Sequence, residues 1–171
     1  MNVVLTGFMC SGKTSVGKLL SKKLNFTLID TDTEIETLTK EKIVDIFAKY
    51  GEEYFRTIES KVVAEVSKRD KCIISTGGGV VLKKENMDNL RRNGIIVNLK
   101  VSPDVVYQRL QNQPGQRPLL NKPNPKEEIE KLLSFREKFY ADCDLQIITD
   151  ELTPEQISDK ILEFVKKFNV Q

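Results

Sequence analysis

The sequence predicts a three-layer α/β fold, in which helices cover both faces of a parallel β-sheet. Five short, β-rich runs alternate along the chain with longer segments whose apolar residues recur at helical spacing. The runs occupy residues 3–5, 26–29, 72–75, 95–99 and 145–148. Because these runs are largely apolar rather than alternating with polar residues, we expect them to be buried on both faces, as strands of a covered parallel sheet are.

Three other segments show the apolar stripe of a helix that packs on a sheet. The stripes consist of Val16, Leu19, Leu20 and Leu24, then Phe55, Ile58, Val62 and Val66, and finally Ile157, Ile161, Phe164, Val165 and Phe168. The last helix is expected to begin at Thr153-Pro154-Glu155-Gln156. Threonine is a capping residue, proline suits the first helical position and glutamine completes a capping box.

Composition limits the classes of function. The 171 residues, 39% hydrophobic and 30% charged, suit one globular domain, and a net charge of +2 gives no strong attraction to nucleic acid or membranes. No apolar run approaches the length of a membrane span, and the N-terminus lacks the features of a signal peptide. We therefore expect no nucleic-acid partner and no membrane partner.

Cysteine and histidine contents narrow the chemistry further. The three cysteines are far apart in sequence and fit neither a zinc site nor a disulfide framework. An odd, scattered set favours a reducing compartment, so we expect a cytoplasmic protein. Histidine is absent, so acid–base work must fall to carboxylates, lysines or water.

The motif with the clearest chemical meaning is G-x-x-x-x-G-K-T, from Gly7 to Thr14. In such a loop the glycines let backbone N–H groups point at phosphate oxygens, the lysine reaches the outer phosphates, and the threonine hydroxyl ligates Mg²⁺. The motif lies between a predicted strand and a predicted helix. Phosphate binding by this loop requires that context, whereas an accidental Gly-Lys turn would not need it. We expect nucleotide contacts from Cys10, Ser11, Gly12, Lys13, Thr14 and Ser15.

Loops of this kind often have a third glycine where this chain has Cys10. The minimal pattern leaves that position free. We therefore expect a working loop with a slightly stiffer backbone.

Three classes of phosphate-loop protein compete for this sequence: a small-molecule kinase, a GTPase switch and an ATPase module of a larger machine. The guanine-reading N-K-x-D of a GTPase has its nearest match in Asn121-Lys122-Pro123-Asn124, which lacks the aspartate. A motor ATPase usually shows an acidic residue at the end of a longer apolar strand, in a larger chain. The kinase is the better supported of the three.

Two carboxylates favour a kinase. Asp30 ends the second predicted strand and Asp32 follows two residues later. One would serve Mg²⁺ or its water, and the other would orient an acceptor hydroxyl and take its proton. A plain helix start is the alternative, because Thr31 to Glu34 and Thr33 to Glu36 both fit a capping box.

Gly77, Gly78 and Gly79 follow the third predicted strand. Three glycines in a row suit a backbone that a ligand approaches closely, at the strand ends where ligands of open parallel sheets gather. A flexible turn is the alternative.

Two arginines are candidate anion sites. Arg136 interrupts the apolar stripe of a predicted helix, and its fork fits a carboxylate, either that of a ligand or one of the protein's own. Arg56 has Glu52, Glu53 and Glu59 one turn away, so pairing on a helix surface explains it adequately.

Residues 112–126 contain four prolines and a glycine, and are too long for a routine connection in a compact domain. Loops of this length tend to be lids or disordered segments. Arg117 would act as a charge-stabilising finger when such a lid closes, or would be a solvated loop residue.

Taken together, the phosphate loop and the segments D-T-D (30–32), F-R-x-x-E (55–59), G-G-G (77–79), R-P-L-L (117–120) and R-x-x-x-Y-A-D (136–142) resemble the shikimate kinase family. They occur in the same order and at similar separations over essentially the whole chain. The resemblance implies one kinase domain over residues 1–171, with a five-stranded parallel sheet in the order 2-3-1-4-5. It also implies a substrate-binding region near residues 31–60, a lid near residues 112–126, and the monomeric state common in the family.

The activity that the resemblance implies is Mg²⁺-dependent transfer of the γ-phosphoryl group of ATP to the 3-hydroxyl of shikimate, in aromatic amino acid biosynthesis. Lys13 would bind phosphates, Thr14 and Asp30 would serve the metal, and Asp32 would hold the reacting hydroxyl as the base. Shikimate would be bound by Arg56, oriented by Glu59, and by Gly77, Gly78, Gly79 and Arg136. Arg117 would be the lid arginine. Arg109 and residues 148–154 would contact the nucleotide, the latter at the adenine.

Gluconate kinases and nucleoside monophosphate kinases use a similar loop and remain the rivals within the enzyme class. D-T-D, G-G-G and R-P-L-L favour shikimate over either. A regulatory nucleotide binder is the rival from another class.

Overall fold

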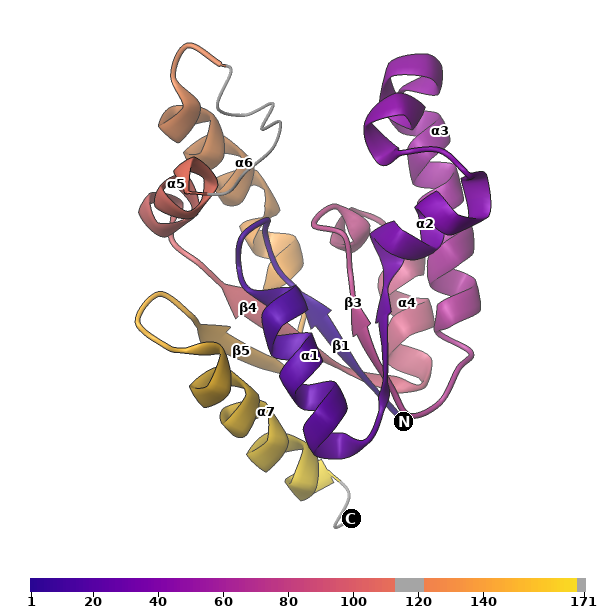
Figure 1. Ribbon diagram of the computed structural model, residues 1–171, viewed down its shortest axis with the longest axis vertical. Coiled ribbons are helices and arrows are strands. Elements are labelled where there is room, and N and C mark those ends of the chain that lie inside the picture. The colour runs from indigo at the N-terminus through magenta and orange to yellow at the C-terminus, as the bar shows by residue number, and fades with distance from the viewer. Residues whose placement is uncertain (113–121, 169–171) are drawn as a thin grey trace.

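The computed structural model describes residues 1–112 and 122–168 of the chain. Its five parallel strands are β1 (Asn2–Thr6), β2 (Thr27–Asp30), β3 (Cys72–Ser75), β4 (Gly94–Lys100) and β5 (Leu145–Ile148). They form one sheet in the order β2-β3-β1-β4-β5 (Figure 1), which confirms the predicted fold class and strand order. Each predicted run became a strand, because β-branched residues favour extended backbone. The ends of the strands differ from the predicted ones by no more than a residue or two.

Seven α-helices and a short 3₁₀ helix are described in these residues. They are α1 (Lys13–Leu24), α2 (Thr31–Thr39), α3 (Ile43–Val66), η1 (Val80–Leu82), α4 (Lys84–Arg92), α5 (Pro103–Gln111), α6 (Pro125–Tyr140) and α7 (Pro154–Phe168). The backbone of Gly51 leaves helical geometry within α3, so that helix consists of two segments that meet at a kink.

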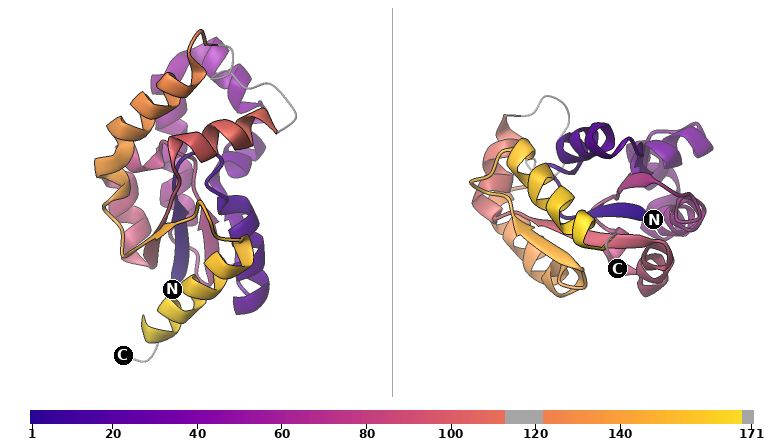
Figure 2. Two further views of the ribbon diagram at one scale, coloured as in Figure 1. Left: turned by 90° about the vertical axis from the view of Figure 1, so that its left-hand side faces the viewer. Right: turned by 90° about the horizontal axis from the view of Figure 1, so that it is seen from below.

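Alternating residues of the central strand face two separate cores. Val3 and Leu5 of β1 pack with the apolar stripes of α1 and α7, whereas Val4 packs with side chains of α3, α4 and α6. The left view in Figure 2 shows α1 and α6 on opposite sides of the sheet. The sheet is therefore covered on both faces, as its apolar strands require.

The last helix begins as predicted. The Thr153 hydroxyl accepts a hydrogen bond from the backbone N–H of Gln156 at 3.2 Å, and the Gln156 side chain accepts one from the backbone N–H of Thr153 at 2.9 Å. This is a complete capping box, with Pro154 at the first helical position. No helix in the described residues is long and apolar enough to cross a membrane.

Candidate active site

The phosphate loop joins the end of β1 to the start of α1, at the carboxyl edge of the sheet. Gly7 has φ 145°, and a Cβ there would lie 2.6 Å from the backbone oxygen of Leu99, so no other residue fits without distortion. The Lys13 ammonium donates to the carbonyls of Gly7 and Phe8, both at 2.8 Å. The loop is thus folded around its own lysine.

Cys10 adopts a left-handed backbone conformation, with φ 61°. This conformation suits glycine and strains a residue with a Cβ, which gives a physical reason for glycine at this position in similar loops. The Cys10 carbonyl accepts a 2.6 Å hydrogen bond from the guanidinium of Arg109 on α5. The predicted nucleotide contact Arg109 therefore lies beside the loop.

A pocket of about 550 Å³ opens above the loop. Its walls include all six loop residues expected to contact nucleotide, together with Arg109, Asp30, Asp32, Gly77 and Gly78. Leu152, Pro154 and Ile157 supply an apolar wall that begins in the predicted adenine segment, residues 148–154. Phosphate-binding donors and an apolar wall thus share one pocket.

Asp30 is the N-cap of α2. Its carboxylate accepts hydrogen bonds from the backbone N–H groups of Asp32 at 3.0 Å and Thr33 at 3.2 Å. A helix does start here, but the two capping boxes suggested by the sequence do not form its cap. The Thr31 hydroxyl instead accepts a 2.9 Å hydrogen bond from the backbone N–H of Gly77, which ties the D-T-D segment to the glycine run.

Asp32 lies where the phosphate loop meets the glycine run. Burial raises the pKa of its carboxyl to about 6, and the nearby carboxylates of Asp30 and Glu59 push in the same direction, while Lys13 and Arg56 oppose the shift. A pKa near neutrality suits a group that accepts a proton during turnover. A Cβ on Gly77 would lie 2.7 Å from Asp32 Oδ1, so glycine is needed there to make room for the carboxylate.

Arg56 pairs with Glu59, as the resemblance implied. The Arg56 guanidinium lies 2.7 Å from Glu59 Oε2 and 3.3 Å from Glu52 Oε1. The Glu59 side chain is 1% exposed and that of Arg56 only 16%, so this is not merely pairing on a helix surface. Burial raises the pKa of Glu59, and the hydrogen bond from Arg56 opposes that rise.

The glycine run makes room for charged side chains. A Cβ on Gly79 would overlap the Arg56 guanidinium. For a Cβ on Gly78, the nearest atom would be one of the Arg136 guanidinium, at 3.5 Å. None of the three has the positive φ that turns often require. Close approach of a charged side chain therefore explains Gly77 and Gly79, whereas no protein atom comes that close to Gly78.

Arg136 projects from α6 toward the same place. Its guanidinium lies over the Phe8 ring, 5.7 Å from the centroid, and donates a long 3.4 Å hydrogen bond to the Gly78 carbonyl. Within residues 1–112 and 122–168 it forms no ion pair with a carboxylate, and its buried Nε has no hydrogen-bond partner. A buried donor of this kind fits an anion supplied from outside the protein.

Some contributors were not singled out from the sequence. The Tyr140 hydroxyl donates a 2.7 Å hydrogen bond to the carbonyl of Gly78, the oxygen that Arg136 also contacts. Buried Ser75 and Thr76 line the nucleotide pocket at the end of β3. The only available signals were the position of Tyr140 within the R-x-x-x-Y-A-D segment and two hydroxyl residues next to the glycines. Arg117 lies outside the described residues.

Oxygen ligands for Mg²⁺ are present in the pocket. The Thr14 hydroxyl and the Asp30 carboxylate both line it, and no group of three or more acidic residues or cysteines that would hold a metal occurs in the described part of the chain. This set fits Mg²⁺ in a kinase, which takes one or two protein ligands and completes its shell with phosphates and water.

Known proteins share both the sequence and this geometry. A model of the shikimate kinase family matches residues 9–166. The shikimate kinase of Thermodesulfovibrio yellowstonii is 46% identical over 162 residues, which covers 95% of this chain and 93% of the relative. That of Caldicellulosiruptor saccharolyticus is 47% identical over 161 residues, with coverage of 94% and 93%.

Solved structures of shikimate kinases have the same fold as this chain. The shikimate kinase of Acinetobacter baumannii in complex with shikimate superposes with a TM-score of 0.89 at 33% identity, covering 99% of this chain and 95% of the other. The shikimate kinase of Aquifex aeolicus gives 0.82 at 34% identity, covering 99% of both chains. This chain belongs to the shikimate kinase family.

Proposed function

We propose that the site described above transfers the γ-phosphoryl group of ATP to the 3-hydroxyl of shikimate, giving shikimate 3-phosphate and ADP. The observation that carries this proposal is the position of Asp32. Asp32 lines the nucleotide pocket with the phosphate-loop lysine, Lys13, and its carboxylate lies against Gly77, as does that of Glu59, the partner of Arg56. A base between a phosphate site and an anion site is what transfer to a hydroxylated acid requires.

The nucleotide would occupy the pocket of about 550 Å³. Backbone N–H groups of residues 10–15 and the Lys13 ammonium would bind its phosphates, and Leu152 and Pro154 would contact the adenine. Arg109 would contact the nucleotide from α5. Bound Mg²⁺, held by Thr14 and Asp30, would neutralise charge on the β- and γ-phosphates.

The acceptor would lie between the glycine run and α6. Arg136 would meet the shikimate carboxylate with its guanidinium, whose Nε has no hydrogen-bond partner in residues 1–112 and 122–168. Arg56, held by Glu59, would meet it from α3. Gly77, Gly78 and Gly79 would let the ring approach the backbone. Asp32 would accept the proton of the shikimate 3-hydroxyl. The oxygen of that hydroxyl would form a bond to the γ-phosphorus, and the bond from this phosphorus to the β–γ bridging oxygen would break.

Further assignments follow the family. Residues 31–60 would form the substrate-binding region and residues 112–126 the lid, with Arg117 stabilising the transferred group, within one kinase domain over residues 1–171. The enzyme would act as a monomer in the cytoplasm, without nucleic-acid or membrane partners.

ADP release measured with shikimate, gluconate and AMP side by side tests the proposal. We expect turnover with shikimate and less than about 1% of that kcat/KM with the other two acceptors, a preference of the size that polar recognition provides. Preferred turnover of gluconate or AMP would assign the site to another small-molecule kinase. Nucleotide binding without transfer to any of them would indicate a regulatory binder.

A further inference from the structure

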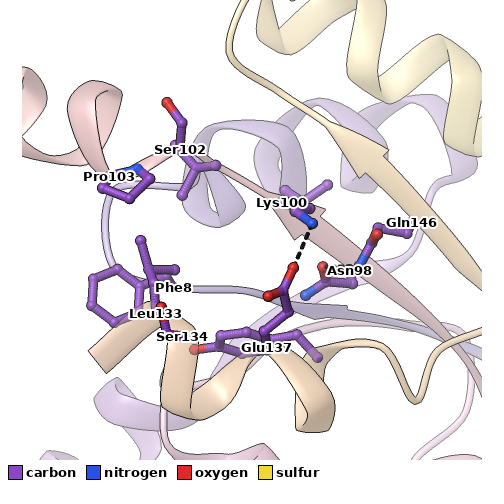
Figure 3. Close-up of a pocket in the computed structure, with 12 residues that line it drawn as sticks. Phe8, Asn98, Lys100, Ser102, Pro103, Leu133, Ser134, Glu137 and Gln146 are labelled. Atoms are coloured by element: carbon purple, nitrogen blue, oxygen red, sulfur yellow. Dashed lines mark hydrogen bonds and ion pairs between the residues drawn. The ribbon is translucent and has the colours of Figure 1, made fainter. Parts of the chain in front are cut away.

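A second pocket, with a volume of about 240 Å³, lies between α6 and the strands β4 and β5 (Figure 3). The reaction proposed above leaves it unused. An apolar cavity of about 150 Å³ holds a benzene ring. The pocket therefore has room for a somewhat larger ring compound.

The walls of this pocket are mostly apolar. Its apolar walls come from the phosphate loop, the connection between β4 and α5, the start of α5 and α6, and consist of Phe8, Val101, Pro103, Leu133 and Tyr140. Burial of an apolar ring against such walls is the main source of affinity in small-molecule pockets. A ring compound fits them better than a polar chain does.

The amide side chains in the pocket already have partners. Asn98 on β4 is paired in register with Thr6 on β1 and with Gln146 on β5. Its side chain donates to the Thr6 hydroxyl at 3.3 Å and accepts from the Gln146 amide at 3.1 Å. Because this row of polar side chains satisfies itself, the pocket does not demand a strongly polar ligand.

The two charges in the pocket cancel. Lys100 donates to Glu137 Oε1 at 2.8 Å, and the dashed line in Figure 3 marks this contact. The Glu137 side chain is 64% exposed, and its second carboxylate oxygen accepts no hydrogen bond from residues 1–112 or 122–168. An uncharged ligand leaves the ion pair intact, and a single N–H or O–H donor would find an acceptor in that oxygen.

We propose that this pocket binds an uncharged ring compound with one hydrogen-bond donor, and that its occupant alters the affinity for shikimate. Two residues link it to the acceptor site. The Phe8 ring lies under the Arg136 guanidinium, and the Tyr140 hydroxyl holds the Gly78 carbonyl beside it. A ligand that restrains the Phe8 and Tyr140 rings changes the position of the Arg136 guanidinium. By linkage, shikimate then changes the affinity for that ligand by the same factor. This second half rests on the proposed role of Arg136.

Indole is a suitable probe, because it is uncharged, has two fused rings and has one N–H donor. Isothermal titration of the full-length protein with saturating ADP and shikimate present should give a dissociation constant on the order of 1 mM or below, as for a fragment of this size. 1-Methylindole, which lacks the donor, should bind more weakly. Absence of indole binding, mutually exclusive binding of indole with shikimate or ADP, or equal affinity for the two probes would overturn the proposed site.

Two matched variants locate the site. Ser134→Trp places a large ring at an exposed position of α6 that lines the pocket, and should weaken indole binding at least tenfold. Gln108→Trp places the same ring at an exposed position of α5 outside it, and should leave binding within twofold. Equal effects of the two variants would refute this location.

Steady-state kinetics test the coupling between this pocket and shikimate binding. Saturating indole should change the KM for shikimate at least twofold in the wild-type enzyme, and Ser134→Trp should abolish that change. An unchanged KM would refute the coupling. Activity without indole is measured in the same series, so loss of the proposed function is distinguished from failure of this inference.

Discussion

The Arg109 guanidinium and the Cys10 carbonyl oxygen are joined by a 2.6 Å hydrogen bond, although the two residues are 99 positions apart in the sequence. This bond ties α5 to the phosphate loop at its only non-glycine residue with a positive φ. The loop therefore keeps its shape although a residue with a side chain occupies a position whose backbone suits glycine.

Cys10→Gly should stabilise the protein relative to Cys10→Ala. A residue with a Cβ in the left-handed region costs roughly 1–2 kcal/mol, and the greater chain entropy of glycine offsets about 0.5–1 kcal/mol of that. We therefore expect the glycine variant to exceed the alanine variant by about 1 kcal/mol in free energy of unfolding, measured by urea denaturation without ligands. An alanine variant as stable as the glycine variant would show that the loop carries no such strain.

Gly79→Ala should impair shikimate binding, and Gly78→Ala is its matched control. The new Cβ at position 79 overlaps the Arg56 guanidinium and displaces it, whereas the one at position 78 meets no atom closer than 3.5 Å. Steady-state kinetics should show a rise of about tenfold or more in the shikimate KM for Gly79→Ala, in line with a lost charge-assisted bond. Gly78→Ala adds a methyl group beside the proposed shikimate site without displacing Arg56, so its shikimate KM should rise less than that of Gly79→Ala. The reverse order would contradict the explanation given for the glycine run.

ADP affinity should fall above about pH 8. Burial lowers the pKa of Lys13 to about 8, with Asp32 and Asp30 opposing the shift, so raising the pH removes the charge that binds phosphate. Between pH 7.5 and 9, the dissociation constant for ADP without metal should rise by roughly eightfold. Lys13→Arg, which stays charged throughout, should bind with a nearly constant affinity. Parallel pH profiles for both proteins would exclude Lys13 as the titrating group.

Arg136→Ala should raise the KM for shikimate and leave that for ATP nearly unchanged. The substitution removes a fork whose buried Nε has no partner in the described part of the chain. The loss is expected to cost about 2–3 kcal/mol of binding, or roughly 30–150-fold in KM. Arg92→Ala, on the exposed side of α4, is the control and should match the wild type. An unchanged shikimate KM in the Arg136 variant would remove this residue from the acceptor site.

Much of the fold follows from local patterns. The five strands, the two-sided core and the capping box at Thr153 depend on residue types a few positions apart, which one sequence displays directly. The strand order came from a resemblance rather than from such patterns, because it depends on contacts between distant segments.

The site was less completely predictable, for the same reason. Asp30 and Asp32 stood out by position, but Thr31 looked like a capping residue until the structure showed its hydroxyl accepting from Gly77. Likewise the strain at Cys10 comes from its positive φ, which the residue type does not predict. Arg136 stood out because it interrupts an apolar stripe, whereas its aromatic neighbour Phe8 lies far away in sequence and became visible only in three dimensions.

The most direct test of the central claim is a single-turnover measurement of phosphoryl transfer from ATP to shikimate by Asp32→Asn. At pH 7.5 the wild-type carboxyl, with a pKa of about 6, is ionised and able to accept the proton, whereas the amide is not. We expect the transfer rate to fall by about 10²–10⁴-fold, with ADP affinity within about threefold of wild type. A transfer rate within a few-fold of wild type would show that Asp32 is not the base.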